Sequence, residues 1–215
     1  MSIPKTIYQT FKTSKLPLIT RWHIYWFRKK NPEYDYQFYD DTRIEQFIEA
    51  YYDRETLTLY QQINIGAAKA DFFRYAILYK LGGIYLDIDS ASKTAFRKFL
   101  LPNDEAVISK ERNADLYVQW ALIFRAGHPF LEKTMDLMLN NLRNNTYPND
   151  VHQMTGPSVY TKAINSCLEQ DPNTPHRVLG TDYQRHLRFK YTLSKLLYAK
   201  GDHWKQIQLT RTVMK

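Results

Sequence analysis

Apolar residues recur along the chain with the period of strands in some segments and the period of helices in others. Short runs rich in β-branched and aromatic residues predict strands, at 3–11, 34–40, 84–89, 105–109 and 116–124. Longer segments with apolar residues three and four apart predict helices, at about 20–30, 40–52, 64–81, 128–144 and 157–169. The tail from about 176 shows no clear period. Helices alternating with short strands indicate an α/β fold, with a mostly parallel central sheet flanked by helices.

The stretch LGGIYLDIDS (81–90) places two acids at the end of a short apolar strand. Gly82-Gly83 is expected to end the preceding helix, because glycine readily takes the left-handed conformation common there. Side chains alternate along a strand, so Tyr85, Asp87 and Asp89 are predicted to share one face. The Cα atoms of the two aspartates would lie roughly 6.5–7 Å apart. Two ionised carboxylates that close repel each other unless a cation such as Mg²⁺ or Mn²⁺ neutralises them. The carboxyl ends of strands are also where open α/β sheets bind ligands.

A further charged pair precedes this strand. Asp71 and Arg74 are three residues apart on the predicted helix 64–81, so they share one helical face. By residue type alone, an Asp-x-Asp sequence is also common where a strand enters a turn, and Asp71–Arg74 is also explained as a weak local ion pair. The two features lie close together in the sequence, and this combination favours a functional site.

The continuous stretch AAKADFFRYAILYKLGGIYLDIDS (67–90) resembles the sugar-binding signature of DXD glycosyltransferases with the GT-A fold. This group includes initiation-specific mannosyltransferases, capsular polysaccharide sugar transferases and the catalytic regions of clostridial glucosylating toxins. The opening IPKTIYQTFK (3–12) is similar to the first strand of the same group, with Tyr8 where a histidine is usual. Weaker similarities lie at GHPFL (127–131) and TGPSVYT (155–161).

The resemblance implies one glycosyltransferase domain over residues 1–215. Its nucleotide-sugar site would lie mainly in 1–125, and its acceptor side and C-terminal lid mainly in 126–215. The implied reaction moves a sugar from a nucleoside-diphosphate sugar to a glycan hydroxyl, with retention of anomeric configuration and with Mn²⁺ or Mg²⁺. A UDP-sugar is the favoured donor, and GDP-mannose is second. The cation would act as a Lewis acid on the departing diphosphate.

The resemblance also implies roles for individual residues. Asp89 would bind the metal directly, and Asp87 would contact both the metal and the ribose. Asp71 would accept hydrogen bonds from sugar hydroxyls, while Arg74 would steady the sugar or the diphosphate through a charge-assisted fork. The other expected site residues are Thr6, Tyr8 and Gln9 around the nucleoside, Gln119 beneath the anomeric carbon, His152 and Thr155 on the acceptor side, His203 (with Asp202 as its rival) as a third metal ligand, and Lys205 and Arg211 in a basic lid.

Composition limits the partners and the compartment. Cys167 is the single cysteine, so an intrachain disulfide is excluded and a reducing compartment is favoured. No run approaches the ~20 apolar residues that span a bilayer, and the N-terminus lacks the apolar segment of a signal peptide, so a cytoplasmic location is expected. The net charge of +8 favours polyanions, phosphorylated small molecules or an anionic membrane, without choosing among them.

Two other classes of protein fit parts of the pattern. A haloacid-dehalogenase-like phosphatase also uses Asp-x-Asp after an apolar strand, but normally on its first strand and with Thr or Val where this chain has Ala91. A nucleic-acid-binding module would use the basic, aromatic segment RWHIYWFRKK (21–30) to stack on bases. However, Trp22, Tyr25 and Trp26 have helical spacing, which predicts a core-facing helix; the segment would otherwise suit an anionic membrane surface. The transferase is favoured, without a nucleic-acid partner.

Overall fold

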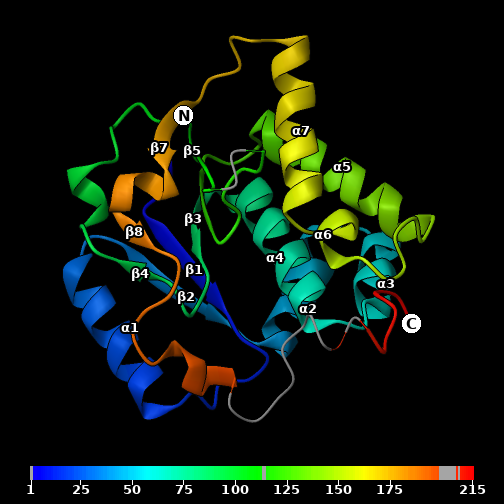
Figure 1. Ribbon diagram of the computed structural model, residues 1–215, viewed down its shortest axis with the longest axis horizontal. Helices are drawn as coiled ribbons and strands as arrows, with labels where there is room; N and C mark the ends of the chain where they lie inside the picture. The colour runs from blue at the N-terminus through cyan, green and yellow to red at the C-terminus, as the bar shows by residue number, and fades with distance from the viewer. Residues whose placement is uncertain (1, 113–114, 199–206, 208) are drawn as a thin grey trace.

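The computed structural model describes residues 2–112, 115–198, 207 and 209–215, which form an α/β fold (Figure 1). Within this part of the chain, six strands form the central sheet in the order β2-β1-β3-β6-β5-β7. Strand β6 runs antiparallel to both of its neighbours, and the other paired strands are parallel, so the predicted mostly parallel sheet is confirmed. The strands of this sheet are β1 (Thr6–Thr10), β2 (Asp35–Tyr39), β3 (Gly83–Leu86), β5 (Ala106–Lys110), β6 (Ala121–Phe124) and β7 (Arg177–Thr181). A separate pair is formed by β4 (Ala91–Ser92) and β8 (Leu187–Arg188).

Helices flank the sheet, with α1 on one side and α4 among the helices on the other (Figure 1). The predicted helices are all present, with ends shifted by a few residues, and α3 and α6 were not anticipated. The helices are α1 (Leu18–Lys30), α2 (Asp41–Tyr51), α3 (Arg54–Gln62), α4 (Gly66–Leu81), α5 (Pro129–Arg143), α6 (Val151–Met154) and α7 (Pro157–Gln170), with short 3₁₀ turns η1 (Phe96–Lys98), η2 (Asp182–Arg185) and η3 (Ser194–Tyr198). In the described part of the chain, we find no helix with the length and apolar character that crossing a bilayer requires.

The strand expected over 116–124 is shorter than predicted. Strand β6 begins only at Ala121, and the preceding residues are joined to β5 by isolated contacts. Tyr117 makes a single bridge to Lys110, and the amide of Val118 donates to the carbonyl oxygen of Ser109 at 2.8 Å. The backbone before β6 is therefore irregular because its pairing with β5 is interrupted.

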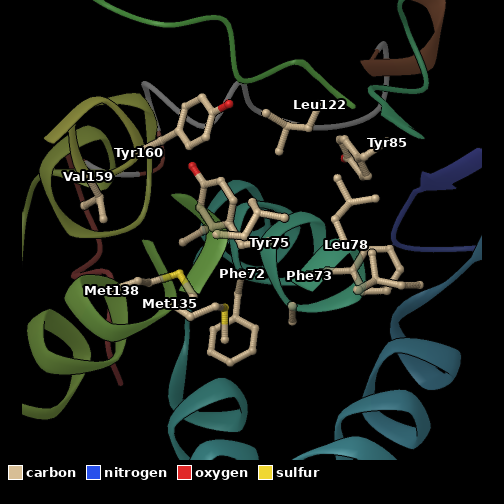
Figure 2. Close-up of a cluster of buried hydrophobic side chains, with 14 of the residues drawn as sticks. Phe72, Phe73, Tyr75, Leu78, Tyr85, Leu122, Met135, Met138, Val159 and Tyr160 are labelled. Atoms are coloured by element: carbon tan, nitrogen blue, oxygen red, sulfur yellow. The ribbon is translucent and has the colours of Figure 1, made fainter. Parts of the chain in front are cut away.

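The larger hydrophobic core lies between the sheet and α4 (Figure 2). Phe72, Phe73, Tyr75 and Leu78 of α4 are all 0% exposed. They pack with side chains from the sheet, α5 and α7, which include Tyr85, Leu122, Met135, Met138, Val159 and Tyr160. A helix that is apolar on nearly all sides is a buried helix. Any charged residue on α4 that faces the sheet is therefore taken out of water.

A smaller core fills the opposite face of the sheet. Ile84 and Leu86 of β3 point into it, whereas Tyr85 between them points into the larger core, as strand alternation predicts. Helix α1 contributes Phe27 to the smaller core. The prediction that the other rings of α1 face the core is wrong, because Trp22, at 61% exposed, lies on the solvent side with its neighbours.

Gly82 and Gly83 join α4 to β3 without space for side chains. Both have positive φ, at 65° and 113°. A Cβ at Gly82 would lie 2.5 Å from the amide nitrogen of Ala126, and one at Gly83 would lie 2.7 Å from the carbonyl oxygen of Thr6. The predicted helix end is confirmed. The lack of side chains at the two glycines also lets β3 lie directly against β1.

His128 caps α5 from a fully buried position. Its Nδ1 accepts a hydrogen bond from the amide of Phe130 at 3.2 Å, so its Nε2–H is the donor to the carbonyl oxygen of Pro175 at 2.9 Å. Burial lowers the pKa of the ring to about 4. The neutral ring is the form that both hydrogen bonds require.

We predict that His128 makes the fold sensitive to mild acid. An unfolded histidine takes up a proton near pH 6.5, but the folded ring does so only near 4, so stability is present above about 6.5 and is lost as pH falls toward 4. The difference in free energy of unfolding between wild type and His128→Asn should shrink by about 2–3 kcal/mol between pH 7 and pH 4.5. Urea unfolding at the two pH values measures it, and parallel pH profiles would contradict the assignment.

Candidate active site

The acids of the Asp-x-Asp pair lie where the sheet changes its direction of winding. From β1 the chain leads to β2 on one side and later to β3 on the other, so β1 and β3 meet at a topological switch point. Ligands of open α/β sheets bind in the crevice at the carboxyl ends of such strands. Strand β3 ends at Leu86, and Asp87 is the first residue beyond it. At the end of β1, Gln9 Nε2 donates to the carbonyl oxygen of Asp87 at 3.2 Å, which joins the two strand ends.

Residues 87–90 form a turn, so the predicted continuation of the strand through Asp89 is wrong. The amide of Ser90 donates to the carbonyl oxygen of Asp87 at 2.9 Å, and the amide of Asp87 donates to that of Trp120 at 2.8 Å. Both Ile88 and Asp89 are buried, at 3% and 4% exposed. The alternation of faces therefore stops at Leu86, because the backbone turns once its pairing with β6 ends.

Arg74 of α4 lies between Asp71 and Asp87. Its Nη2 is 3.0 Å from Asp87 Oδ1 and 3.4 Å from Asp71 Oδ1. Its Nη1 donates to the carbonyl oxygen of Gln119 at 3.0 Å, and its guanidinium carbon lies 4.8 Å from the centre of the Tyr85 ring. The side chains of Arg74 and Asp71 are only 7% and 8% exposed, so solvent screens these charges weakly. Arg74 thus fastens the buried helix to the end of β3.

Both carboxylate oxygens of Asp71 accept hydrogen bonds from side chains. Gln119 Nε2 donates to Oδ1 at 2.9 Å, and Thr155 Oγ1 donates to Oδ2 at 2.9 Å. Gln119 Nε2 also donates to the hydroxyl of Tyr75 at 2.6 Å. Five of the residues singled out from the sequence therefore meet in one place. We refer to them as the acid–arginine cluster: Asp71, Arg74, Asp87, Gln119 and Thr155.

Burial is the largest influence on the two acids of the cluster. It raises the pKa of Asp71, against the opposing effects of Arg74 and of the Thr155 hydrogen bond. It also raises the pKa of Asp87, opposed by Arg74 and by the Tyr85 hydroxyl, which donates to Asp87 Oδ1 at 3.0 Å. Burial alone would lower the pKa of Arg74, but the nearby acids outweigh it and that pKa is raised. The two acids share the positive charge of Arg74, so a further cation beside them would be stabilised.

The segment after β7 covers the second acid of the pair. Ser90 Oγ donates to the carbonyl oxygen of Phe189 at 2.7 Å, and the amide of Tyr191 donates to that of Asp89 at 2.8 Å. Lys190 Nζ lies 3.9 Å from Asp89 Oδ2 and 5.1 Å from the centre of the Phe189 ring. A segment without a readable period in the sequence therefore completes the site. Lys190 is a site residue that sequence reasoning missed.

A cleft of about 2300 Å³ opens in front of the cluster. Its walls come from the loop after β1, the first half of α4, the turn at 87–90 and the tail segment. This volume exceeds the roughly 300–1,000 Å³ of a typical small-ligand site, so a nucleotide and a second substrate have room together. Its lining carries more basic than acidic side chains, and this excess of positive charge suits a diphosphate. The lysines and arginines that line it are Lys12, Lys15, Arg21, Lys69, Arg74, Lys93, Arg112, Arg185, Arg188 and Lys190.

None of the three residues expected around the nucleoside lines this cleft. Gln9 is 1% exposed and contacts the site through its hydrogen bond to the carbonyl oxygen of Asp87. Tyr8 is 4% exposed and packs in the larger core, where its ring lies 6.2 Å from that of Tyr39. Burial raises the pKa of Tyr8 to about 12. Thr6 lies at the start of β1, with its carbonyl oxygen against Gly83, at the opposite end of the sheet from Asp87.

The residues expected on the acceptor side and in the lid occupy different positions. His152 lines the cleft, whereas Thr155 is fully buried behind its wall and contacts Asp71 of the cluster through its hydroxyl. Arg211 is exposed and does not line the cleft. His203, Asp202 and Lys205 lie outside the described residues.

The acids of the turn fit a hard divalent cation whose other ligands come from a substrate. Mg²⁺ is commonly held by one or two carboxylates together with phosphate and water oxygens. Asp87 and Asp89 are two such carboxylates beside a cleft with a cationic lining. Among the residues that the structure describes, no group of three His, Cys, Asp or Glu is arranged to hold a metal. Two carboxylates suit a cation that takes further ligands from phosphate and water oxygens.

Two tyrosines support the cluster although sequence reasoning gave them no role. Tyr85 holds Asp87 Oδ1, and the hydroxyl of Tyr75 accepts from Gln119. Their positions carried a signal: Tyr85 is two residues before Asp87 on one face of the predicted strand, and Tyr75 is four residues after Asp71 on the same helical face.

Residues 23–112 match the protein family described as the glycosyltransferase sugar-binding region containing the DXD motif. An uncharacterized glycosyltransferase of Acanthamoeba polyphaga mimivirus is 31% identical over 159 residues. The initiation-specific alpha-1,6-mannosyltransferase of Candida albicans is 25% identical over 201 residues, and the inositol phosphoceramide mannosyltransferase 3 of Schizosaccharomyces pombe is 33% identical over 134. These alignments cover 72%, 75% and 60% of this chain, but only 61%, 52% and 35% of the relatives.

Solved structures of glycosyltransferases share the fold. The PaToxG glycosyltransferase superposes with a TM-score of 0.64 at 21% identity, over 80% of this chain and 71% of that one. The UDP-bound glycosyltransferase domain from the YGT toxin superposes with a TM-score of 0.57 at 10% identity, over 82% of this chain and 79% of that one.

The sheet with its single reversed strand, together with the acid pair at its switch point, defines the fold of a glycosyltransferase domain. Within that fold, residues 23–112 match the glycosyltransferase sugar-binding region that contains the DXD motif. The resemblance seen at 67–90 is thereby confirmed. The phosphatase and nucleic-acid-binding alternatives are not favoured.

We predict that Arg74 is essential for the stability of the fold around the cluster. Arg74→Ala would leave two acids buried without their counter-charge, so the free energy of unfolding should fall by about 3–5 kcal/mol. Arg74→Lys should recover only part of the loss, because an ammonium cannot reproduce the planar fork. Chemical denaturation measures both.

Arg143 provides the matched control, because it pairs with Glu55 at 2.7 Å on the surface, where both side chains are at least half exposed. Arg143→Ala should change stability little. A loss for Arg74→Ala no larger than the loss for Arg143→Ala would contradict the role given to Arg74.

Proposed function

We propose that this chain transfers a sugar from a nucleoside-diphosphate sugar to a hydroxyl of a glycan, with the help of Mn²⁺ or Mg²⁺. The observation that carries the proposal is the position of the Asp-x-Asp turn. It lies at the switch point of the sheet, is held by Arg74, and faces a large cleft lined by cationic side chains. Ligand recognition at this point is what the fold favours physically.

In the proposed complex, Asp87 and Asp89 would hold the cation, with a third ligand from His203 as the resemblance suggests. The bound cation would supply Lewis-acid stabilisation to the departing diphosphate. The described cations nearest to these acids are Arg74 and Lys190, at 3.0 Å and 3.9 Å from carboxylate oxygens. They would limit the repulsion between the acids and the incoming phosphates.

The donor sugar would lie against Asp71 and Gln119. Hydrogen bonds from Gln119 and Thr155 fix the orientation of the Asp71 carboxylate, so its acceptor positions are set before a sugar arrives. Arg74 would act mainly as a positioning residue, since its guanidinium already contacts two carboxylates and a carbonyl oxygen. His152 would face the acceptor, and Lys205 would contribute to a lid.

A UDP-sugar is the donor we favour, with GDP-mannose second. The UDP-bound state of the YGT toxin domain, which shares the fold, supports uridine. The mannosyltransferase names of the fungal relatives support the second candidate. We further propose retention of anomeric configuration, by attack of the acceptor on the side of the leaving group with proton transfer to the phosphate oxygen, a route that requires no separate protein base.

We expect Asp87→Asn and Asp89→Asn to reduce cation-dependent hydrolysis of the donor by about 100-fold or more, because each removes charge stabilisation of the leaving group. Release of the nucleoside diphosphate from UDP-glucose, UDP-N-acetylglucosamine or GDP-mannose, with and without Mn²⁺, provides the assay. Asp136→Asn, an exposed acid on α5, is the matched control and should behave as wild type. Unchanged hydrolysis in both variants of the turn, with the fold intact, would exclude the proposed site.

The identity of the base should appear in thermal stability. A nucleotide present at about 100 times its dissociation constant should raise the melting temperature by about 5–10 °C for a chain of this size. We expect UDP with Mn²⁺ to give this shift, GDP with Mn²⁺ a smaller one, and either nucleotide alone little change. A larger shift with GDP would reverse the donor assignment, and no shift with any nucleotide would count against the transferase.

A further inference from the structure

The solvent side of α1 carries large apolar side chains. Leu18, Trp22, Tyr25 and Trp26 are 78%, 61%, 53% and 52% exposed. Their spacing places them on one stripe, opposite Phe27, which is buried in the smaller core. We call these four residues the α1 stripe. The helix is thus fixed to the body of the protein by one face and leaves an apolar face to solvent.

The positive charge of the protein is concentrated in two segments of the sequence, one of which contains this stripe. Residues 2–32 contain seven Lys and Arg and no Asp or Glu, and residues 183–198 contain four and none. Subtracting these eleven leaves 19 basic against 22 acidic residues in the rest of the chain, a net charge of −3. A chain of +8 is therefore divided into a strongly basic part and a slightly acidic remainder.

The two basic segments lie against each other. The rings of His23 and Tyr191 stack at 4.1 Å and 20°, and the hydroxyls of Thr20 and Tyr191 are 2.8 Å apart in a buried hydrogen bond. The second segment adds two exposed leucines, Leu193 and Leu196, at 58% and 51%. Apolar and basic side chains thus occur together on both segments.

The arrangement of the rings favours a lipid surface over nucleic acid. Trp22 and Trp26 meet edge to face at 6.1 Å and 71°, and Tyr25 and Trp26 do so at 5.5 Å and 80°. Rings that pack against each other in this way form an apolar pad rather than a row of parallel faces onto which bases can stack. Leu18, the most exposed member of the stripe, has no polar group to offer a nucleotide.

We propose that the α1 stripe docks on the surface of an anionic lipid bilayer. Trp and Tyr are the side chains that settle at the headgroup level, and neighbouring lysines and arginines are attracted to anionic headgroups. Lys29 follows the stripe at helical spacing and is exposed, as is Arg21. Because Arg21 also lines the cleft, docking would place one edge of the cleft beside the membrane.

Co-sedimentation with vesicles tests this proposal without nucleotide or metal. The chain should bind phosphatidylcholine vesicles that contain phosphatidylserine and bind pure phosphatidylcholine much more weakly. Trp22→Ser with Trp26→Ser should weaken binding by about tenfold or more, and Lys29→Glu by about fivefold or more. Tryptophan fluorescence of wild type should shift to shorter wavelength on binding. These side chains are exposed, so the melting temperature of each variant should match that of wild type.

Matched controls come from elsewhere on the surface. Leu101→Ser removes an apolar side chain that is 51% exposed, and Lys162→Glu reverses an exposed charge on α7, away from α1 (Figure 1). Both should bind vesicles as wild type does. Asp87→Asn should also bind normally, which separates this proposal from the transferase.

Equal vesicle binding by wild type and the double tryptophan variant would overturn the proposal, as would equal binding to neutral and anionic vesicles. Binding to a single-stranded oligonucleotide through the same rings, without vesicle binding, would assign the stripe to nucleic acid instead.

Discussion

The contact of Arg74 with Asp71 and Asp87 is the interaction on which the site depends. It joins the buried helix α4 to the residue at which β3 ends. Removing three charged groups from water is costly, and their attraction offsets the cost only if the remaining polar atoms are also satisfied. Gln119 and Thr155 satisfy Asp71, and the carbonyl oxygen of Gln119 accepts from Arg74. The same hydrogen bonds that make these buried charges tolerable also fix the positions of the side chains in the site.

The sequence predicted the parts of this arrangement that rest on local rules. Apolar periodicity located α4, paired glycines located its end, and a spacing of three placed Asp71 and Arg74 on one face. The hydrogen bonds that complete the cluster are not local, because Gln119 and Thr155 are 48 and 84 residues away from Asp71. Those two residues were reached through candidate roles in a family pattern, and their shared contact with Asp71 could not be read from spacing.

The errors have a common physical origin. Periodicity shows that a segment has two different faces, but it does not show which neighbouring element packs against each face. Trp22 and Trp26 were expected in the core, yet Phe27 on the opposite side of α1 is the residue buried there. Tyr8 was expected at a ligand, yet its side of β1 faces α4. Strand pairing is equally nonlocal: Asp89 leaves the strand pattern because β6 pairs no further than Leu86.

The charges around the turn explain why a cation and a diphosphate would bind better together than singly. A divalent cation alone would approach Arg74 and Lys190, which already lie beside Asp87 and Asp89. A diphosphate alone would approach the two acids of the turn. Each partner supplies the charge that offsets the other's repulsion, and the cationic wall of the cleft stabilises the anionic end of the pair. Under the proposed function, the described acids would suit a ligand that arrives as a metal–diphosphate complex.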